Sequence, residues 1–273
     1  MKSITDPSKS KAATTYNAAS DFFDNEALSF WNKFGAATVK RLHLKDGMKV
    51  LDVACGSGAS ALPAAINVMP KGNVIAVDIA ENLLQLGRSK VNKLGLHNNI
   101  KFLVGDMTEL IYPNECFDAV ICVFGIFFVS DMPALLKELW RMVKPTGKLA
   151  ITTWGPNLFA PLYDVWRKEI KNERPDLYAG FNPWDKITSV QSVTELFHSA
   201  DIKNVDVSSE NAIHPLHTPE DWWTIVLGSG LRWTTDKLGE EAALRVYNQN
   251  MQWIKNRGIK SIETNVIYAV AEK

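Results

Sequence analysis

Residues 50–58 read Val50-Leu51-Asp52-Val53-Ala54-Cys55-Gly56-Ser57-Gly58. The first half is a short apolar run, typical of a buried strand, and the second half is rich in small residues. Small side chains at 54, 56 and 58 allow the backbone to turn sharply and to approach a ligand closely. This stretch predicts the junction between the first strand and first helix of an α/β domain, with a ligand-binding loop between them.

Two acidic residues follow at the spacing that such a loop requires. Asp78 stands twenty residues beyond Gly58, at the end of the predicted second strand 73–79. A carboxylate at that point can accept hydrogen bonds from both ribose hydroxyls of an adenosine. Gly105-Asp106-Met107 closes the predicted third strand 100–105, where a carboxylate can hold the adenine amino group. A glycine loop alone is weak evidence for a cofactor site. The loop followed in order by these two strand-end aspartates predicts an adenosine cofactor.

The choice between adenosine cofactors depends on Asp52. The loop also satisfies the dinucleotide pattern, because Ala61 is tolerated at its third glycine position. Asp52, however, places a carboxylate on the last turn of the first strand, where it repels a pyrophosphate. S-adenosylmethionine carries an ammonium and a sulfonium and has no phosphate, so the sequence favours it. A nicotinamide oxidoreductase remains the alternative.

Strands and helices alternate after this loop. Further strands are predicted at 117–124 and 148–154, with helices at 60–68, 80–94 and 132–143. Short apolar strands alternating with amphipathic helices indicate a parallel sheet covered on both faces. After Trp154 we expect a helix at 189–200, strands at 205–212 and 265–272, and mostly helix over 214–260.

The N-terminal segment is expected to form a mobile arm of about 15 residues followed by a helix over 21–42. We therefore divide the chain into an N-terminal arm with lid helices (1–45), a cofactor-binding core (46–155) and a remainder (156–273) that carries the last strands and substrate-cap insertions. All three parts are expected to form one domain.

The composition limits the class of protein. The 273 residues include 30 basic and 30 acidic side chains. A net charge of zero removes the usual electrostatic drive toward nucleic acid or an anionic membrane. The polar N-terminus resembles no secretory signal, and no apolar run of about 18 residues is present. Three cysteines without a CxxC pair predict neither a disulfide framework nor a metal site. We expect a cytoplasmic protein; its oligomeric state stays open.

The motifs together resemble one family. LDVACGSG, VDIA, GDM, FDAVICVFGIFFVSD and LKELWRMVKPTGKLAITTWG follow one another in the order seen in class I S-adenosylmethionine-dependent methyltransferases. The pattern is most similar to the ubiquinone/menaquinone biosynthesis branch, and the likeness covers roughly residues 15–155. It implies a Rossmann-like seven-stranded sheet whose last strand is antiparallel, with helical cap insertions in the C-terminal third.

The resemblance also implies roles for individual residues. The methionine part of the cofactor would lie against Asp52, Ala54, Cys55, Gly56 and Gly58, the ribose against Asp78, and the adenine against Ile79, Gly105, Asp106 and Met107. Val123 would lie near the sulfonium. Tyr16, Trp31, Phe34 and Gly35 fall where relatives fold an N-terminal helix over the cofactor.

The acceptor side is less defined. Many relatives have a histidine pair after the fourth strand, where this chain has Phe127-Phe128, which indicates a small apolar or aromatic acceptor. Phe124, Trp154 and Trp222 are further candidates for acceptor contacts. A base is needed only if the acceptor loses a proton. His198, His214, His217 and Tyr163 are candidates, and His214 and His217 are preferred because they follow the sixth strand. A non-catalytic methyltransferase-like subunit is the second alternative.

Overall fold

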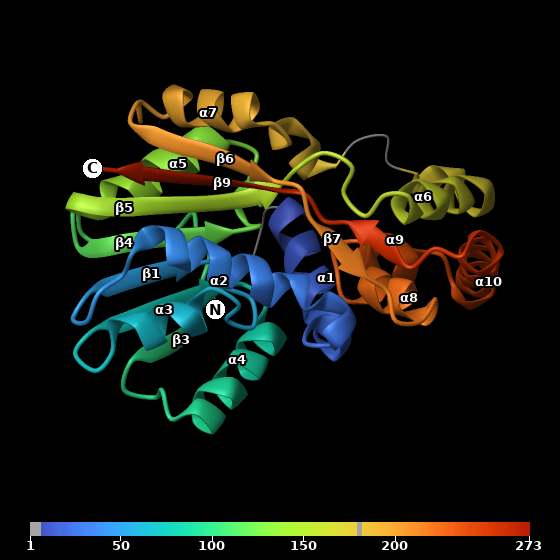
Figure 1. Ribbon diagram of the computed structural model, residues 1–273, viewed down its shortest axis with the longest axis horizontal. Coiled ribbons are helices and arrows are strands. Elements are labelled where there is room, and N and C mark those ends of the chain that lie inside the picture. Colours follow the sequence, from blue (N-terminus) through green and yellow to red (C-terminus); the bar gives the residue numbers. More distant parts are fainter. Residues whose placement is uncertain (1–6, 179–181) are drawn as a thin grey trace.

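The computed structural model describes residues 7–178 and 182–273, which form a layered α/β structure (Figure 1). Its sheet has the strand order β3-β2-β1-β4-β5-β9-β6. The strands are β1 (Lys49–Val53), β2 (Asn73–Asp78), β3 (Ile100–Val104), β4 (Phe117–Val123), β5 (Val143–Trp154), β6 (Val205–Glu210) and β9 (Val266–Glu272). Only β9 runs antiparallel to its two neighbours in this sheet. The predicted fold class is confirmed.

Helices cover both faces of the sheet. α2 (Phe30–Leu42), α3 (Ala61–Val68) and α4 (Glu81–Leu94) lie on one face, and α5 (Met132–Arg141) and α7 (Val190–Ser199) lie on the other (Figure 1). Successive strand residues divide between the two faces, as the pleat requires: Val50 belongs to one apolar core and Leu51 to the other. Burial on both faces explains why these strands are apolar without alternation.

The register of the parallel strands places the ligand loop. Val53 at the end of β1 is paired with Val77 of β2 and with Cys122 of β4. The carboxyl ends of these strands therefore meet at one edge of the sheet. In open α/β sheets this edge is where ligands bind.

The N-terminal segment differs from the prediction. Residues 7–15, expected as part of a mobile arm, belong to helix α1 (Pro7–Phe23), while residues 1–6 lie outside the described part. The predicted helix over 21–42 is interrupted by the short helix η1 (Glu26–Leu28), because the Asn25 side chain accepts a hydrogen bond from the Ala27 amide and turns the chain. α1 is held against α4, where Asn82 donates two hydrogen bonds to Asn17, from its backbone amide to Oδ1 and from Nδ2 to the backbone carbonyl.

The C-terminal third adds a cap at one end of the sheet. It comprises α6 (Leu162–Glu173), η3 (Pro175–Leu177), η4 (Pro183–Ile187), α8 (Glu220–Leu227), α9 (Arg232–Lys237) and α10 (Glu240–Arg257). α6, α8, α9 and α10 lie beyond the sheet on the right of Figure 1, whereas α7 packs on the sheet. The short strands β7 (Ile213–Pro215) and β8 (Ser261–Glu263) form a second small sheet that the sequence pattern did not predict.

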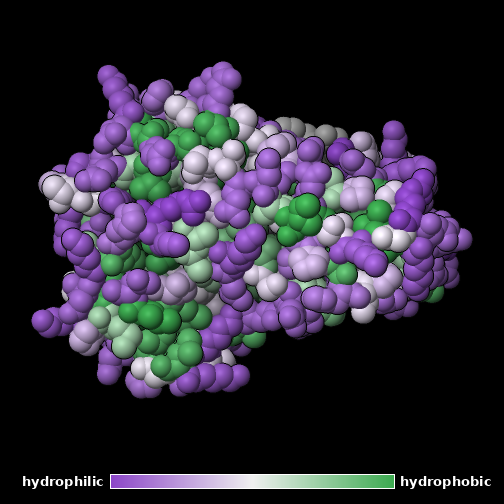
Figure 2. Space-filling model, viewed as in Figure 1, coloured by the Kyte–Doolittle hydropathy of each residue, from purple (hydrophilic) through white to green (hydrophobic). Residues whose placement is uncertain are grey.

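The surface is mainly hydrophilic in the view of Figure 2, with apolar residues gathered over α3, where Ile66 and Met69 are exposed. Within the ranges 7–178 and 182–273, no helix is both long and apolar enough to cross a membrane.

Candidate functional site

A first cavity opens at the carboxyl ends of β1, β2 and β4, where the ligand loop lies. Most of the cofactor residues predicted from the sequence line it: Tyr16, Trp31, Ala54, Cys55, Gly56, Asp78, Ile79, Gly105, Asp106, Met107 and Val123. Phe124 and Phe128, expected on the acceptor side, line it as well. The prediction missed seven lining residues: Lys9, Ala12, Phe23, Ala59, Ser60, Leu83 and Val129. The structure thus gathers residues of the N-terminal segment and of four of the five motifs around one space.

The loop at the base of this cavity has the backbone shape that its small residues indicate. Ala54, Gly56 and Gly58 have φ values of 53°, 54° and 94°, which lie in the left-handed region that favours glycine. Asp78 braces the loop: Oδ2 accepts from the Gly56 amide at 2.8 Å and Oδ1 accepts from the Ala80 amide at 2.8 Å. Burial raises the pKa of Asp78, against the opposing effect of these amides. The carboxylate therefore shapes the loop as well as facing the cavity.

Asp52 lies beneath the loop and is fully buried. Its Oδ2 accepts from the Ser60 hydroxyl at 2.6 Å, while Oδ1 has no hydrogen-bond partner within the protein. Burial raises its pKa to about 7, with a smaller contribution from the negative charge of Asp78. Asp52 is not among the residues that line the cavity, so its effect on a ligand there is electrostatic.

Helix α1 closes the cavity on its outer side. Tyr16 and Ala12 of α1 line it, and Lys9 pairs with Asp106 at 2.7 Å. A second ion pair joins Lys90 to Asp24, directly after α1, at 2.6 Å. The first residues of α1 carry no apolar pattern, so nothing in the sequence indicated that Lys9 belongs to the site.

Several predicted site residues lie outside the cavity lining. Phe34 and Trp154 are buried and pack against Phe124 from below. Gly35 supports the loop indirectly, because a Cβ there would lie 2.4 Å from the Ala59 carbonyl oxygen. Gly58 turns the loop against the Phe102 ring.

A second cavity of about 410 Å³ adjoins the first. The two share the lining residues Ala12, Tyr16, Phe128 and Val129. Residues from η2 (Ile126–Phe128), α6, η3, η4 and the start of α9 form its remaining walls with α1. Its lining is rich in aromatic residues: Phe127, Phe128, Tyr163, Trp166, Tyr178 and Trp184.

The preferred histidines are not brought to either cavity. His214 belongs to β7, is buried, and bonds through Nε2 to the Ala27 carbonyl at 2.9 Å. Burial lowers its pKa, and its ring packs edge-on against Phe30. The backbone amide of His217 donates to Asp221 at 2.6 Å as part of the turn into α8. His214 is therefore engaged in packing, whereas His217 is exposed and lines neither cavity.

Of two further candidates for the acceptor side, Tyr163 lines a cavity and Trp222 does not. Trp222 is fully buried and donates from Nε1 to Asn250 at 2.9 Å, so it belongs to the cap core and not to an acceptor surface. Tyr163 lines the second cavity, and its hydroxyl accepts from Asn182 at 2.6 Å. Burial raises the pKa of Tyr163 to about 12, so this hydroxyl stays protonated at neutral pH.

The unpartnered polar atoms around the first cavity fit S-adenosylmethionine. Trp31 lines the cavity and its indole N–H has no acceptor in the protein, while Asp52 Oδ1 beneath the loop has no donor. The carboxylate of the cofactor can accept from the Trp31 N–H, and the positive charge of its ammonium and sulfonium is favoured by the buried Asp52 carboxylate beneath the loop. Asp78 and Ile79 are available for its ribose and adenine. The fold and this site define a class I S-adenosylmethionine-dependent methyltransferase.

Comparison with known proteins identifies the family. The sequence profile of the ubiE/COQ5 methyltransferase family matches residues 9–175, so the chain belongs to that family. A demethylmenaquinone methyltransferase of Listeria welshimeri is 34% identical over 163 residues, which are 57% of this chain and 67% of the relative. One of Geobacillus stearothermophilus is 36% identical over 138 residues, 50% of this chain and 58% of the relative. The oxidoreductase alternative has no support from these matches.

Solved structures agree on the fold. A putative methyltransferase of Bacillus halodurans superimposes with a TM-score of 0.57 at 19% sequence identity, covering 88% of this chain and 99% of that protein. The family match ends at residue 175, whereas most of the cap follows that residue.

Proposed function

We propose that the protein transfers the methyl group of S-adenosylmethionine to a small aromatic molecule that binds in the second cavity. The observation that carries this proposal is the wall common to both cavities, formed by Ala12, Tyr16, Phe128 and Val129. A ligand in the second cavity reaches the first past these residues. The aromatic lining suits an acceptor with a planar ring.

The residues at the common wall act by positioning and by excluding water. When bound, S-adenosylmethionine supplies the methyl group. Tyr16 packs edge-on against Phe128, with 5.6 Å between the ring centroids. The passage between the two cavities is therefore bounded by aromatic rings. Holding two reactants in the right orientation is the main requirement for such a transfer, and a dry apolar site favours a reaction that neutralises the charge on sulfur.

The described lining residues offer no imidazole base. Tyr16 and Tyr163 are the tyrosines nearest the common wall and the aromatic pocket, and burial raises the pKa of each. Both hydroxyls therefore stay protonated at neutral pH and serve as hydrogen-bond donors. We infer that the acceptor atom is already nucleophilic when it binds.

Demethylmenaquinone is the acceptor in the names of the relatives and is a second candidate. The sequence identity of 34% favours it. However, Tyr178, Asn182, Trp184 and Gly230 of the second cavity all follow residue 175, where the family match ends. The reduced quinone therefore belongs in the panel of acceptors, together with smaller phenols and amines.

The test combines labelled S-adenosylmethionine with that panel and the variant Trp184→Ala. Trp184 lines only the second cavity, so we expect its truncation to weaken acceptor use about tenfold or more, as loss of a large buried aromatic contact does. The affinity for S-adenosylhomocysteine should not change. Trp253→Ala in α10, whose ring packs on Arg257 away from both cavities, is the matched control. Equal acceptor kinetics in both variants would place the acceptor elsewhere.

A further inference from the structure

The second cavity has an unbalanced set of charges. Its described lining includes Lys11 of α1, Arg167 of α6 and Lys186 of η4, and it includes no aspartate or glutamate. The chain as a whole has 30 basic and 30 acidic residues. An all-basic set contributed by three separate elements is therefore a local property of this cavity, and it adds positive potential to an aromatic pocket.

Arg167 is held in place by aromatic rings. Its guanidinium carbon lies 5.4 Å from the centre of the Tyr163 ring and 5.2 Å from that of Tyr178, and Nη2 donates to the Tyr178 hydroxyl at 3.0 Å. A guanidinium stays protonated at any physiological pH and presents its N–H groups as a rigid planar fork. Because the rings already restrict it, little conformational freedom is left to lose when it binds an anion.

Neighbouring hydrogen-bond donors point to the same kind of ligand. Trp166 lines the cavity with only 4% of its surface exposed, and its indole N–H has no acceptor within the protein. Burial lowers the pKa of Lys11, because the ammonium is partly removed from water. A ligand that brings negatively charged oxygens can supply the acceptor that the Trp166 N–H lacks, whereas a neutral hydrocarbon cannot.

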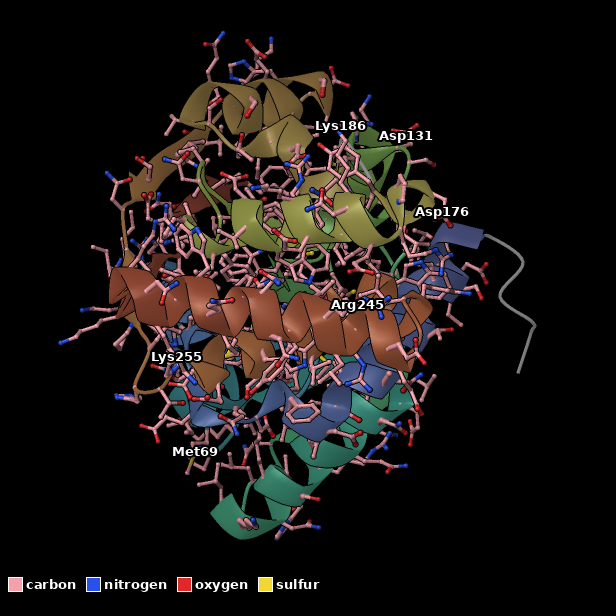
Figure 3. All side chains as sticks on the ribbon, turned by 90° about the vertical axis from the view of Figure 1, so that its right-hand side faces the viewer. Met69, Asp131, Asp176, Lys186, Arg245 and Lys255 are labelled. Atoms are coloured by element: carbon pink, nitrogen blue, oxygen red, sulfur yellow. The ribbon has the colours of Figure 1, made fainter. Side chains whose placement is uncertain are left out.

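Four acidic residues lie close in the sequence to residues that line the second cavity. Asp131 caps α5 by accepting from Ala134, Asp176 pairs with Arg174, and Asp185 accepts from the Asn182 amide at 2.7 Å. Asp164 is exposed, and none of these four carboxylates lines the cavity. Figure 3 looks onto this end of the molecule, with Lys186, Asp131 and Asp176 labelled.

We propose that the methyl acceptor is an aromatic molecule with an anionic group, such as a carboxylate, sulfonate or phosphate, and that Arg167 binds this group with help from Lys11 and Lys186. This proposal rests on the proposed function of the same cavity. Under this proposal tight binding requires the anionic group, so neutral quinols should bind more weakly than the acceptor. The cap residues that follow the family match supply part of this selectivity.

The experiment compares ligands of one shape and different charge. The whole protein, saturated with S-adenosylhomocysteine, is titrated by calorimetry with 2-naphthoate, 2-naphthalenesulfonate and 2-naphthyl phosphate, and with the neutral 2-naphthamide. We expect at least one anion to bind about tenfold or more tightly than the amide, since hydrogen bonds to charged groups are the stronger ones. The three anions distinguish a carboxylate site from a sulfonate or phosphate site. The preference should shrink as salt is added.

Arg167→Met should remove that preference, and Lys168→Met, at an exposed position on the same helix, should retain it. Lys11→Met provides a second variant if Arg167→Met does not fold. Equal binding of anion and amide, or no binding of any of the four, overturns the anionic acceptor while leaving the methyltransferase assignment intact. Failure of the protein to bind S-adenosylhomocysteine would instead overturn the proposed function itself.

Discussion

The ammonium of Lys9 in α1 lies 2.7 Å from Asp106 Oδ2, just beyond the end of β3, and also donates to the Thr108 hydroxyl at 2.6 Å. This ion pair ties the start of α1 across the cavity that is to hold the adenine. Both side chains are about one-fifth exposed, so the pair is only partly screened by water. Asp106 holds α1 in place and is also the expected partner of the adenine amino group.

With α1 seated, the first cavity has a volume of about 100 Å³. Small-molecule sites usually enclose roughly 300–1,000 Å³. We therefore expect α1 to move outward as the cofactor binds, and Lys9→Met to speed both binding and release of S-adenosylhomocysteine. Hydrogen exchange in residues 9–23 should be faster in this variant before ligand is added, as for a lid held less firmly. Lys40→Met, on the exposed face of α2, serves as control, and identical exchange in the two variants would contradict a latch.

Asp78→Ala is expected to lower the affinity for S-adenosylhomocysteine by about a hundredfold or more, because two hydrogen bonds to a charged group are lost and each contributes roughly 1.5–3 kcal/mol. The variant removes the ribose contacts and also the brace on the Gly56 amide. Calorimetry measures the change. Asp46→Ala, which removes a hydrogen bond to the Lys71 amide in a remote turn, should leave the affinity unaltered.

Asp52 makes both stability and cofactor binding depend on pH. Its pKa is raised from 3.8 to about 7 in the folded state, so between pH 4 and 7 the folded protein holds a proton that the unfolded chain releases. The stability from this group is therefore present at low pH and is lost as the pH rises toward and through 7. A cationic cofactor favours the ionised carboxylate, so its affinity should rise with pH from 6 to 8 and its binding should release protons.

Asp52→Asn tests this relation. The variant should be more stable than the original protein at pH 8, should bind S-adenosylmethionine more weakly there, and should show a smaller dependence of affinity on pH. Calorimetry in buffers of different ionisation enthalpy counts the protons. An unchanged proton count in Asp52→Asn would assign the titration to another group.

Gly35→Ala should destabilise the protein by about 1–3 kcal/mol or more, the usual cost of adding a methyl group where there is no room. The new Cβ would meet backbone atoms of Ala59 and Ser60, which cannot turn away as a flexible side chain can. Because the ligand loop must shift, cofactor affinity should fall as well. Thermal unfolding and calorimetry report the two effects, and Ala36→Ser at the adjacent exposed position should change neither.

The acceptor residues illustrate the limit of prediction from the sequence. Phe127 and Phe128 were singled out because they stand where many relatives have a histidine pair, and both line the second cavity. His214 was preferred as a base because it follows the sixth strand, yet the fold buries it against Phe30 and Ala27. The pattern around a histidine does not reveal which carbonyl its ring will meet.

The sequence by itself determined those features of this protein that depend on residues close together along the chain. The glycine loop, Asp78 at the end of its strand and the alternation of strands with helices follow from local backbone preferences and from the two periodicities of apolar residues. Those features were sufficient for the fold class and the cofactor. The second cavity was decided by tertiary structure alone, because Lys11, Arg167 and Lys186 come from elements that are far apart in the sequence and meet only in the fold. The net charge of this cavity depends on which side chains the fold brings together, and the spacing of residues along the sequence does not show which ones those are.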